Sequence, residues 1–253
     1  RPYYNGYYSD REGNQKAANH VVMLRNTSKG HSLYTTFQLQ KNFVDGILKG
    51  LYLNGSYSFG QSRGVTDGTS SVATSAWKYR AALDGNAEEV GYTAGSFDGR
   101  LLLSASYTAN WSKYAATSFG LIYQRYRPFR YSYCYNGDAN GDSQFSNDLM
   151  YIPANFDEVK DHLLPGDFDS QEDAWKAMNA FIEQDPYLSK HRGEYAERNG
   201  AVAPFANQLD LSVSHDIKIY QKNGRSHTLR FSFNIANFLN LLNRNWGVVQ
   251  TTV

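Results

Sequence analysis

The feature of this sequence that most constrains its fold is an alternation of apolar and polar residues with a period of two. From Leu101 to Trp111, one parity carries apolar side chains and the other carries mostly hydroxyl groups. Successive side chains of a β-strand point to opposite faces, so such a segment has one apolar and one polar face. The segments that we expect to be strands are 19–26, 31–43, 47–61, 99–111, 115–133, 206–221 and 225–238.

These segments indicate an all-β protein whose apolar faces need an apolar environment. Aromatic residues make up 15% of the chain, and the many tyrosines suit a surface where each ring lies partly in hydrocarbon and partly in water. A formal net charge of +1 gives no basis for a nucleic-acid partner. We therefore expect an antiparallel transmembrane β-barrel in a bacterial outer membrane, with membrane lipid as one partner.

Three short connections test this interpretation, because a tight turn fixes the register of the two strands that it joins. Three-residue loops at 44–46, 112–114 and 222–224 each keep apolar residues opposite apolar residues, and Gly46 is expected in the left-handed conformation. The predicted opposite pairs are Phe43 with Ile47, Leu39 with Leu51, Phe37 with Leu53, Ile217 with Leu229 and Val213 with Phe233.

The connections also differ strongly in length between the two ends of the strands. The three short turns lie at one end, and long loops at about 63–98 and 136–205 lie at the other, as in bacterial outer-membrane barrels. Such barrels have even numbers of strands, and an open sheet edge in lipid leaves backbone groups unsatisfied. We therefore expect residues 1–253 to supply about seven or eight strands of a larger barrel.

The second long loop contains one predicted helix. After Ser170, apolar residues recur at helical spacing, and they are Trp175, Met178, Phe181 and Ile182. We expect a short, capped amphipathic helix that packs on the loop itself. Trp175 is also a candidate ligand-facing residue, as part of a vestibule that binds cargo.

A cluster of oxygen-bearing side chains in the same loop suggests a metal site. Calcium takes six to eight oxygen ligands, and carboxylates and amides at alternate positions of a short loop are one way to gather them. The loop lacks the glycine and the bidentate glutamate of an EF-hand, so a solvated turn whose side chains cap their own backbone is the alternative. The candidate calcium ligands are Asp138, Asn140, Asp142 and Asp148, and Asn147 adjoins them.

A basic and aromatic segment lies at the outer end of the strand that begins at residue 115. Arg125, Arg127 and Arg130 alternate with tyrosines there. These arginines are candidate ligand-facing residues, for a carboxylate of the cargo or for anionic lipid headgroups. The alternative is that they are solvated charges above an aromatic girdle.

We expect no catalytic centre in this chain. Cys134 is the single cysteine, so no disulfide within the chain can form, and its tyrosine neighbours suggest an ordinary strand residue. The histidines form no metal-binding pair, and no nucleophile elbow is present.

Five segments resemble the C-terminal half of the barrel of TonB-dependent outer-membrane transporters from the Bacteroidetes, in particular the Oar-like group. The segments follow the order of that family from about the middle of the chain to its end. Each segment alone is a weak signal, whereas the ordered set is specific. They are Gly137–Asp142, Asn147–Pro153, Lys190–Asn199, Pro204–Asp210 and Asn237–Gly247.

The resemblance implies a 22-stranded barrel whose lumen holds a plug, with import driven by the inner-membrane TonB machinery. Residues 1–253 would supply wall and outer loops of the C-terminal part of that barrel, whereas the plug and the contact with TonB would come from residues outside this sequence. Members of the family differ in cargo, which includes peptides and glycans. The resemblance leaves the cargo open, and also whether a surface lipoprotein is a partner.

Two other functions produce similar alternating strands. A soluble β-sandwich module that binds carbohydrate would bury the apolar residues of each strand between two sheets. A complete small outer-membrane barrel that acts as an adhesin would need an eighth strand, for which residues 1–10 are the candidate.

Overall fold

The computed structural model describes residues 7–9, 15–17, 24–68, 70–142, 144–220 and 226–250. The chain divides into two compact units. The sheet unit comprises 33–61, 97–129 and 203–253, and the loop unit comprises 1–32, 62–96 and 130–202. Of the predicted strand 19–26, residues 19–23 lie outside the described residues, and residues 24–26 are not in a strand.

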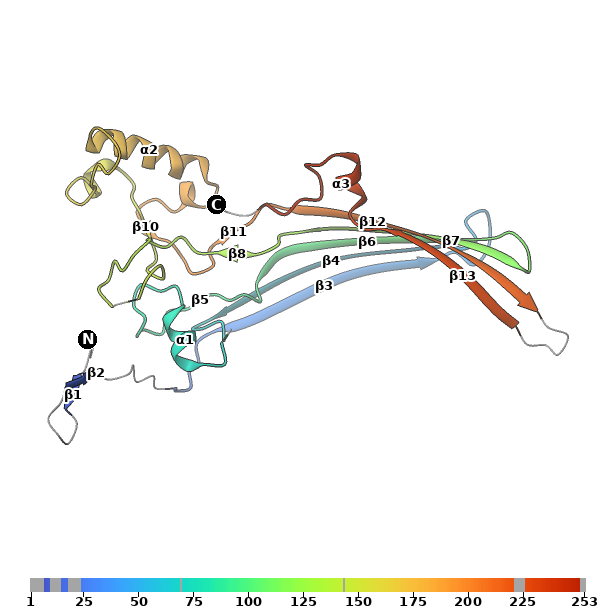
Figure 1. Cartoon of the computed structure of the whole chain (residues 1–253), viewed down its shortest axis with the longest axis horizontal. Helices are drawn as coiled ribbons and strands as arrows, with labels where there is room; N and C mark the ends of the chain where they lie inside the picture. Colours follow the sequence, from blue (N-terminus) through green and yellow to red (C-terminus); the bar gives the residue numbers. More distant parts are fainter. Residues whose placement is uncertain are drawn as a thin grey trace. The chain divides into compact units, whose positions relative to one another are not determined.

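Six long strands lie side by side in one sheet, in the order β13-β12-β7-β6-β4-β3 (Figure 1). The pairings along this path from β13 to β4 are antiparallel, and the short β5 (Gly91–Tyr92) pairs with the end of β4. The predicted all-β character is therefore confirmed. The bounds are β3 (His31–Asn42), β4 (Leu51–Gly64), β6 (Phe97–Asn110), β7 (Ala115–Tyr126), β12 (Ala206–Tyr220) and β13 (Ser226–Ile235).

The sheet is open within the described residues. Its order runs from β13 at one edge to β3 at the other, and these two edge strands do not pair with each other. The sequence predicts seven long strands, and the described part of the chain contains six. No closed barrel is present in that part.

Two of the three predicted hairpins have the predicted register. Trp111 N–H donates to the Ala115 carbonyl at 3.0 Å, which closes the loop at 112–114. In the last hairpin, the two predicted pairs are observed, although the loop at 222–224 lies outside the described residues. These two pairs are Ile217 with Leu229 and Val213 with Phe233.

The register predicted for the first hairpin is wrong. Phe43 N–H donates to the Leu51 carbonyl at 2.9 Å, so Phe43 rather than Leu39 lies opposite Leu51. The turn is wider than three residues because both Gly46 and Gly50 have positive φ, of 70° and 92°. The predicted left-handed conformation of Gly46 is confirmed. Because the shift is by an even number of residues, each side chain keeps its predicted face.

Two predicted strands are too long. The strand predicted at 115–133 ends at Tyr126, since Pro128 has no N–H group for a sheet hydrogen bond. After it, β8 (Arg130–Tyr131) pairs with β11 (Ala201–Val202). The strand predicted at 225–238 ends at Ile235, because Asn237 turns the backbone with φ 53° into the short helix α3 (Phe238–Leu242).

The loop unit contains the predicted helix. Its bounds are α2 (Gln171–Gln184), and Ser170 caps it by accepting the Asp173 N–H at 3.1 Å. The other elements are β1 (Tyr7–Ser9), β2 (Gln15–Ala17), α1 (Ala73–Lys78), β9 (Tyr151–Ile152), the 3₁₀ turns Phe156–Glu158 and Leu188–Lys190, and β10 (Glu194–Tyr195).

The compact apolar core belongs to the loop unit. Ile152, Ile182 and Leu188 are fully buried and pack with Ala196. In the described sheet unit, by contrast, the apolar residues that are buried are Ala116, Ala203 and Ala206, all of them small. Within the described residues, the large apolar side chains of the sheet unit are therefore not part of a buried core.

Candidate functional site

One face of the sheet is apolar and uncovered. The registers place odd-numbered residues of adjacent strands opposite one another, and opposite residues share a face. Many of the large apolar residues of this parity are between 37% and 83% exposed, and others, such as Leu51 and Leu211, are half-buried. The exposed ones include Leu33, Phe37, Leu39, Leu53, Tyr57, Leu103, Tyr107, Phe119, Leu121, Val213, Ile217, Leu229, Phe231 and Phe233. We call this surface the apolar face.

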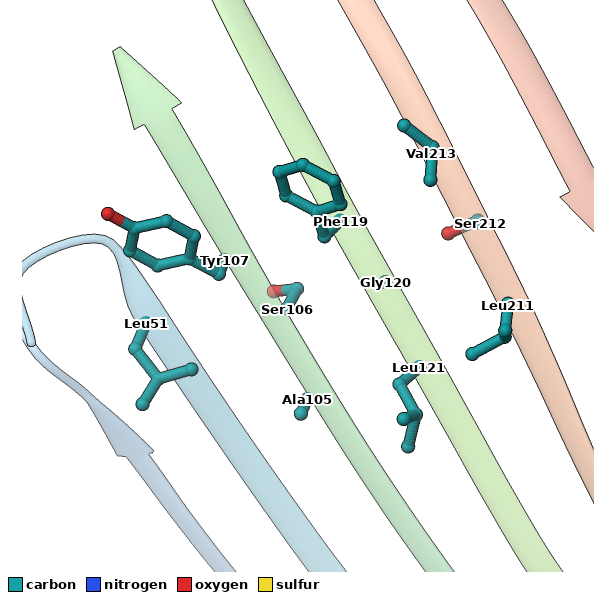
Figure 2. Close-up of a pocket in the computed structure, with 10 residues that line it drawn as sticks. All are labelled: Leu51, Ala105, Ser106, Tyr107, Phe119, Gly120, Leu121, Leu211, Ser212 and Val213. Carbon is teal, nitrogen blue, oxygen red and sulfur yellow. The ribbon is translucent and has the colours of Figure 1, made fainter.

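The apolar face contains a shallow depression of about 280 Å³ (Figure 2). Figure 2 shows two rows of apolar side chains with a strip between them, where the residues are Ser106, Gly120 and Ser212. An added Cβ on Gly120 would lie 2.3 Å from Ser212 Oγ. The walls are formed by Leu51, Ala105, Tyr107, Phe119, Leu121, Leu211 and Val213.

The opposite, even-numbered face carries polar side chains that bond to one another across the strands. Gln38 Nε2 donates to Asn54 Oδ1 at 2.8 Å, and Gln124 Nε2 donates to Gln208 Oε1 at 3.0 Å. Similar contacts join Thr36 to Ser58, Thr108 to Ser118 and, as a bidentate ion pair, Arg230 to Asp216. This face suits contact with water or with a polar partner.

Polar groups mark both ends of the apolar face along β7. At the end of the short turns, Trp111 Nε1 donates to Thr117 Oγ1 at 2.7 Å, and Thr117 contacts His215 Nδ1 at 2.8 Å. At the other end, Tyr123 O–H donates to Asn207 Oδ1 at 2.8 Å. Along β7, the apolar segment is thus bounded by aromatic and polar side chains at both ends.

The candidate ligand-facing arginines are held by aromatic rings and by backbone carbonyls. Arg125 and Arg127 lie 4.4 and 4.2 Å from the centre of the same ring, Phe205, and Arg127 also donates to the Ala203 carbonyl at 2.9 Å. Arg130 lies 4.0 Å from the centre of the Tyr92 ring. The structure therefore brings Arg125 and Arg127 together and places Arg130 on a different ring.

Trp175 and several tyrosines of the loop unit pack against other aromatic rings. Trp175 contacts the Phe156 ring at 6.1 Å, and Tyr133 stacks on Tyr187 at 6.2 Å. Burial raises the pKa of Tyr187 to about 12 and raises the pKa of Tyr133 further. The Tyr133 hydroxyl donates to Asp185 Oδ2 at 2.6 Å, so it fixes the C-terminal end of α2.

Cys134 lies half-buried near Asp148. Burial first, and then the negative charge of Asp148, raise the pKa of the Cys134 thiol to about 11. The thiol is therefore protonated at neutral pH, and a nucleophilic thiolate is strongly disfavoured.

The candidate calcium ligands form a turn that bonds to its own backbone. Asp138 Oδ1 accepts the N–H groups of Gly141 and Asp142 at 2.8 and 3.0 Å, and Asn140 Oδ1 accepts the Asp142 N–H at 2.9 Å. Asp148 Oδ2 accepts the Ala139 N–H at 2.7 Å. Asp148 thus joins the cluster although it lies several residues later in the chain.

The turn of the candidate calcium ligands adjoins a buried residue that the sequence pattern does not predict as part of the site. Gln144 is 2% exposed and adjoins the same turn, where its N–H donates to Asp142 Oδ1 at 2.8 Å. It belongs to no periodic pattern, so only the structure reveals its burial. Among the residues described, no three carboxylate, imidazole or thiol groups are placed together to hold a metal ion.

Comparison with known families, curated proteins and solved structures gives no match. In the part of the chain that the structure describes, no helix is both long and apolar enough to cross a membrane.

Buried arginines organise the loop unit. Arg198 Nη1 and Arg80 Nη1 both donate to the Val65 carbonyl, at 2.6 and 2.9 Å. Burial lowers the pKa of both guanidinium groups, and their bonds to backbone carbonyls offset the cost of desolvation. Through these bonds Arg198 joins the segment 190–199 to the segment that contains Val65.

Proposed function

We propose that this chain forms part of the wall and outer loops of a TonB-dependent importer in a bacterial outer membrane. The apolar face would contact lipid, and the even-numbered face would line the lumen and face a plug. The loop unit would capture cargo on the outside. The observation that carries the proposal is a sheet on which most of the exposed large apolar side chains lie on one face, while polar side chains bond to one another on the other face.

The exposed area favours a hydrocarbon environment. Burying one large apolar side chain is worth about 1.5–3 kcal/mol, and soluble monomers rarely expose a large contiguous apolar patch. At least fourteen large apolar residues of the apolar face are each 37% exposed or more. A β-sandwich would cover such a face with a second sheet, and in the described residues these side chains are uncovered.

The height of the apolar band also supports this proposal. On β7, the segment from Thr117 to Arg125 spans nine residues with both ends included, and a tilted strand crosses a bilayer in about 9–11 residues. Aromatic side chains at both ends match the girdles of outer-membrane barrels.

The open edges require further strands. In lipid, the unpaired backbone groups of β3 and β13 would each cost several kcal/mol, so additional strands must pair with both edges. This requirement favours a large barrel over a small barrel made from these six strands alone. The resemblance to the Oar-like transporters supplies the expected number, 22 strands.

A pair of adjacent substitutions tests which face meets lipid. Phe233→Arg places a charge on the apolar face, beside Val213 in the same row, and we expect it to cost about 2–4 kcal/mol in the bilayer. Asn234→Arg places the same side chain on the opposite face and should cost less than about 1 kcal/mol. Folding of the native protein into lipid vesicles, followed by urea titration, measures both. Equal cost at the two positions would contradict the proposal.

A further inference from the structure

The segment from Gln144 to Asp148 buries side-chain oxygens that accept no hydrogen bond. Gln144 Oε1, Asn147 Oδ1 and Asp148 Oδ1 are enclosed, and these residues are only 2%, 6% and 4% exposed. A buried acceptor without a partner costs about 1–3 kcal/mol, and a charged oxygen costs more. Three such oxygens within five residues therefore suggest that a positively charged group satisfies them.

The orientation of Asp148 places one of these oxygens at the acidic turn. Its Oδ2 accepts the N–H groups of Ala139 and Asn140, at 2.7 and 3.3 Å, so the carboxylate points into the turn. Oδ1 belongs to the same carboxylate and is the atom without a partner. Asp142, 8% exposed, lies in that turn, and neither Asp142 nor Asp148 forms an ion pair with a lysine or arginine of the described chain.

The donor atoms indicate a hard cation. All of them are oxygens, two from carboxylates and two from amides, and this donor set suits calcium, whereas zinc prefers nitrogen and sulfur. The two carboxylates would balance the charge of one divalent ion. Asp138 and Asn140, which already accept backbone N–H groups, hold the turn in shape.

We propose that the loop of residues 138–148 binds one calcium ion through Asp142, Gln144, Asn147 and Asp148. The ion would fix the acidic turn to the segment that follows it. That segment is anchored elsewhere in the loop unit, because Ala82 N–H donates to the Asn147 carbonyl at 3.0 Å and Leu149 N–H donates to the Ala82 carbonyl at 3.4 Å. Calcium would thereby order the loop unit, independently of the lipid contacts of the sheet.

Calorimetric titration of calcium into the native protein, freed of metal with a chelator and held in detergent, tests this site. We expect one ion per chain, with a Kd between about 10⁻⁶ and 10⁻³ M. Asp148→Asn keeps an oxygen for the Ala139 N–H and replaces the unpartnered oxygen with an NH₂ group. We expect it to fold and to bind calcium at least tenfold more weakly.

Asp169→Asn is the matched control, because Asp169 is an exposed carboxylate of the same unit. It should bind calcium as the unchanged protein does. Hydrogen exchange gives a second measurement, since calcium should protect the amides of residues 138–148 in the native protein and not in Asp148→Asn. Absence of calcium binding, or equal affinity in Asp148→Asn, would overturn the proposal. The comparison of Phe233→Arg with Asn234→Arg would be unaffected by that result.

Discussion

Two glycines explain why the first hairpin departs from its predicted register. A three-residue loop needs one left-handed glycine, and the sequence offers Gly46 for that role. The structure uses Gly50 as well, with φ 92°, and an added Cβ there would lie 2.7 Å from the Thr108 carbonyl oxygen. Sequence periodicity predicts the face on which each residue lies. The need for glycine at position 50 arises from contact with Thr108, which is distant in sequence and lies on a neighbouring strand.

These two glycines give a matched pair of substitutions. We expect Gly50→Ala to destabilise the sheet by about 2–4 kcal/mol, because it combines a left-handed residue with a backbone clash. Gly46→Ala has the same kind of strain, with φ 70°, but nothing within 4 Å of the added Cβ, and should cost about 1–2 kcal/mol. Urea unfolding of the native protein in lipid vesicles measures both. A larger loss at Gly46 would show that the turn is described wrongly.

Among the elements, two of the three hairpins and α2 follow from local patterns, whereas the first hairpin and the strand ends do not. The β12–β13 register follows from the parity of its apolar residues, and α2 follows from Ser170 and from helical spacing. The alternation of residues does not predict the end of β7 at Tyr126, because the alternation continues in the sequence past Pro128. The pairing of β8 with β11 joins residues about 70 positions apart, and such long-range contacts leave no periodic signal.

The helix α2 contributes to the core of the loop unit through Ile182. Ile182→Ala should destabilise that unit by about 2–5 kcal/mol, because the side chain is fully buried against Ile152 and Leu188. Phe181→Ala removes a larger side chain that is 45% exposed and should cost less. Hydrogen exchange of the α2 amides reports both losses. The reverse order would contradict the assignment of the buried face.

For the chain as a whole, the alternation of residues predicted a two-faced sheet, and the structure contains one. The candidate sites were less predictable, since Arg125 and Arg127 meet over Phe205 and Asp148 reaches the turn at Asp142 only through folding. A burial pattern such as that of Gln144 depends on the packing of loops, for which a single sequence gives no rule. The proposed function depends on the claim that the apolar face contacts lipid.

A nitroxide scan of β13 in lipid vesicles tests that claim most directly. Each position from Leu229 to Asn234 is labelled singly in the native protein, on a Cys134→Ser background, and its collision rates with oxygen and with a water-soluble nickel chelate are measured. We predict high oxygen and low nickel accessibility at odd positions, with the reverse at even positions. Odd positions that are shielded from both reagents would show that protein covers the apolar face, and would contradict the account.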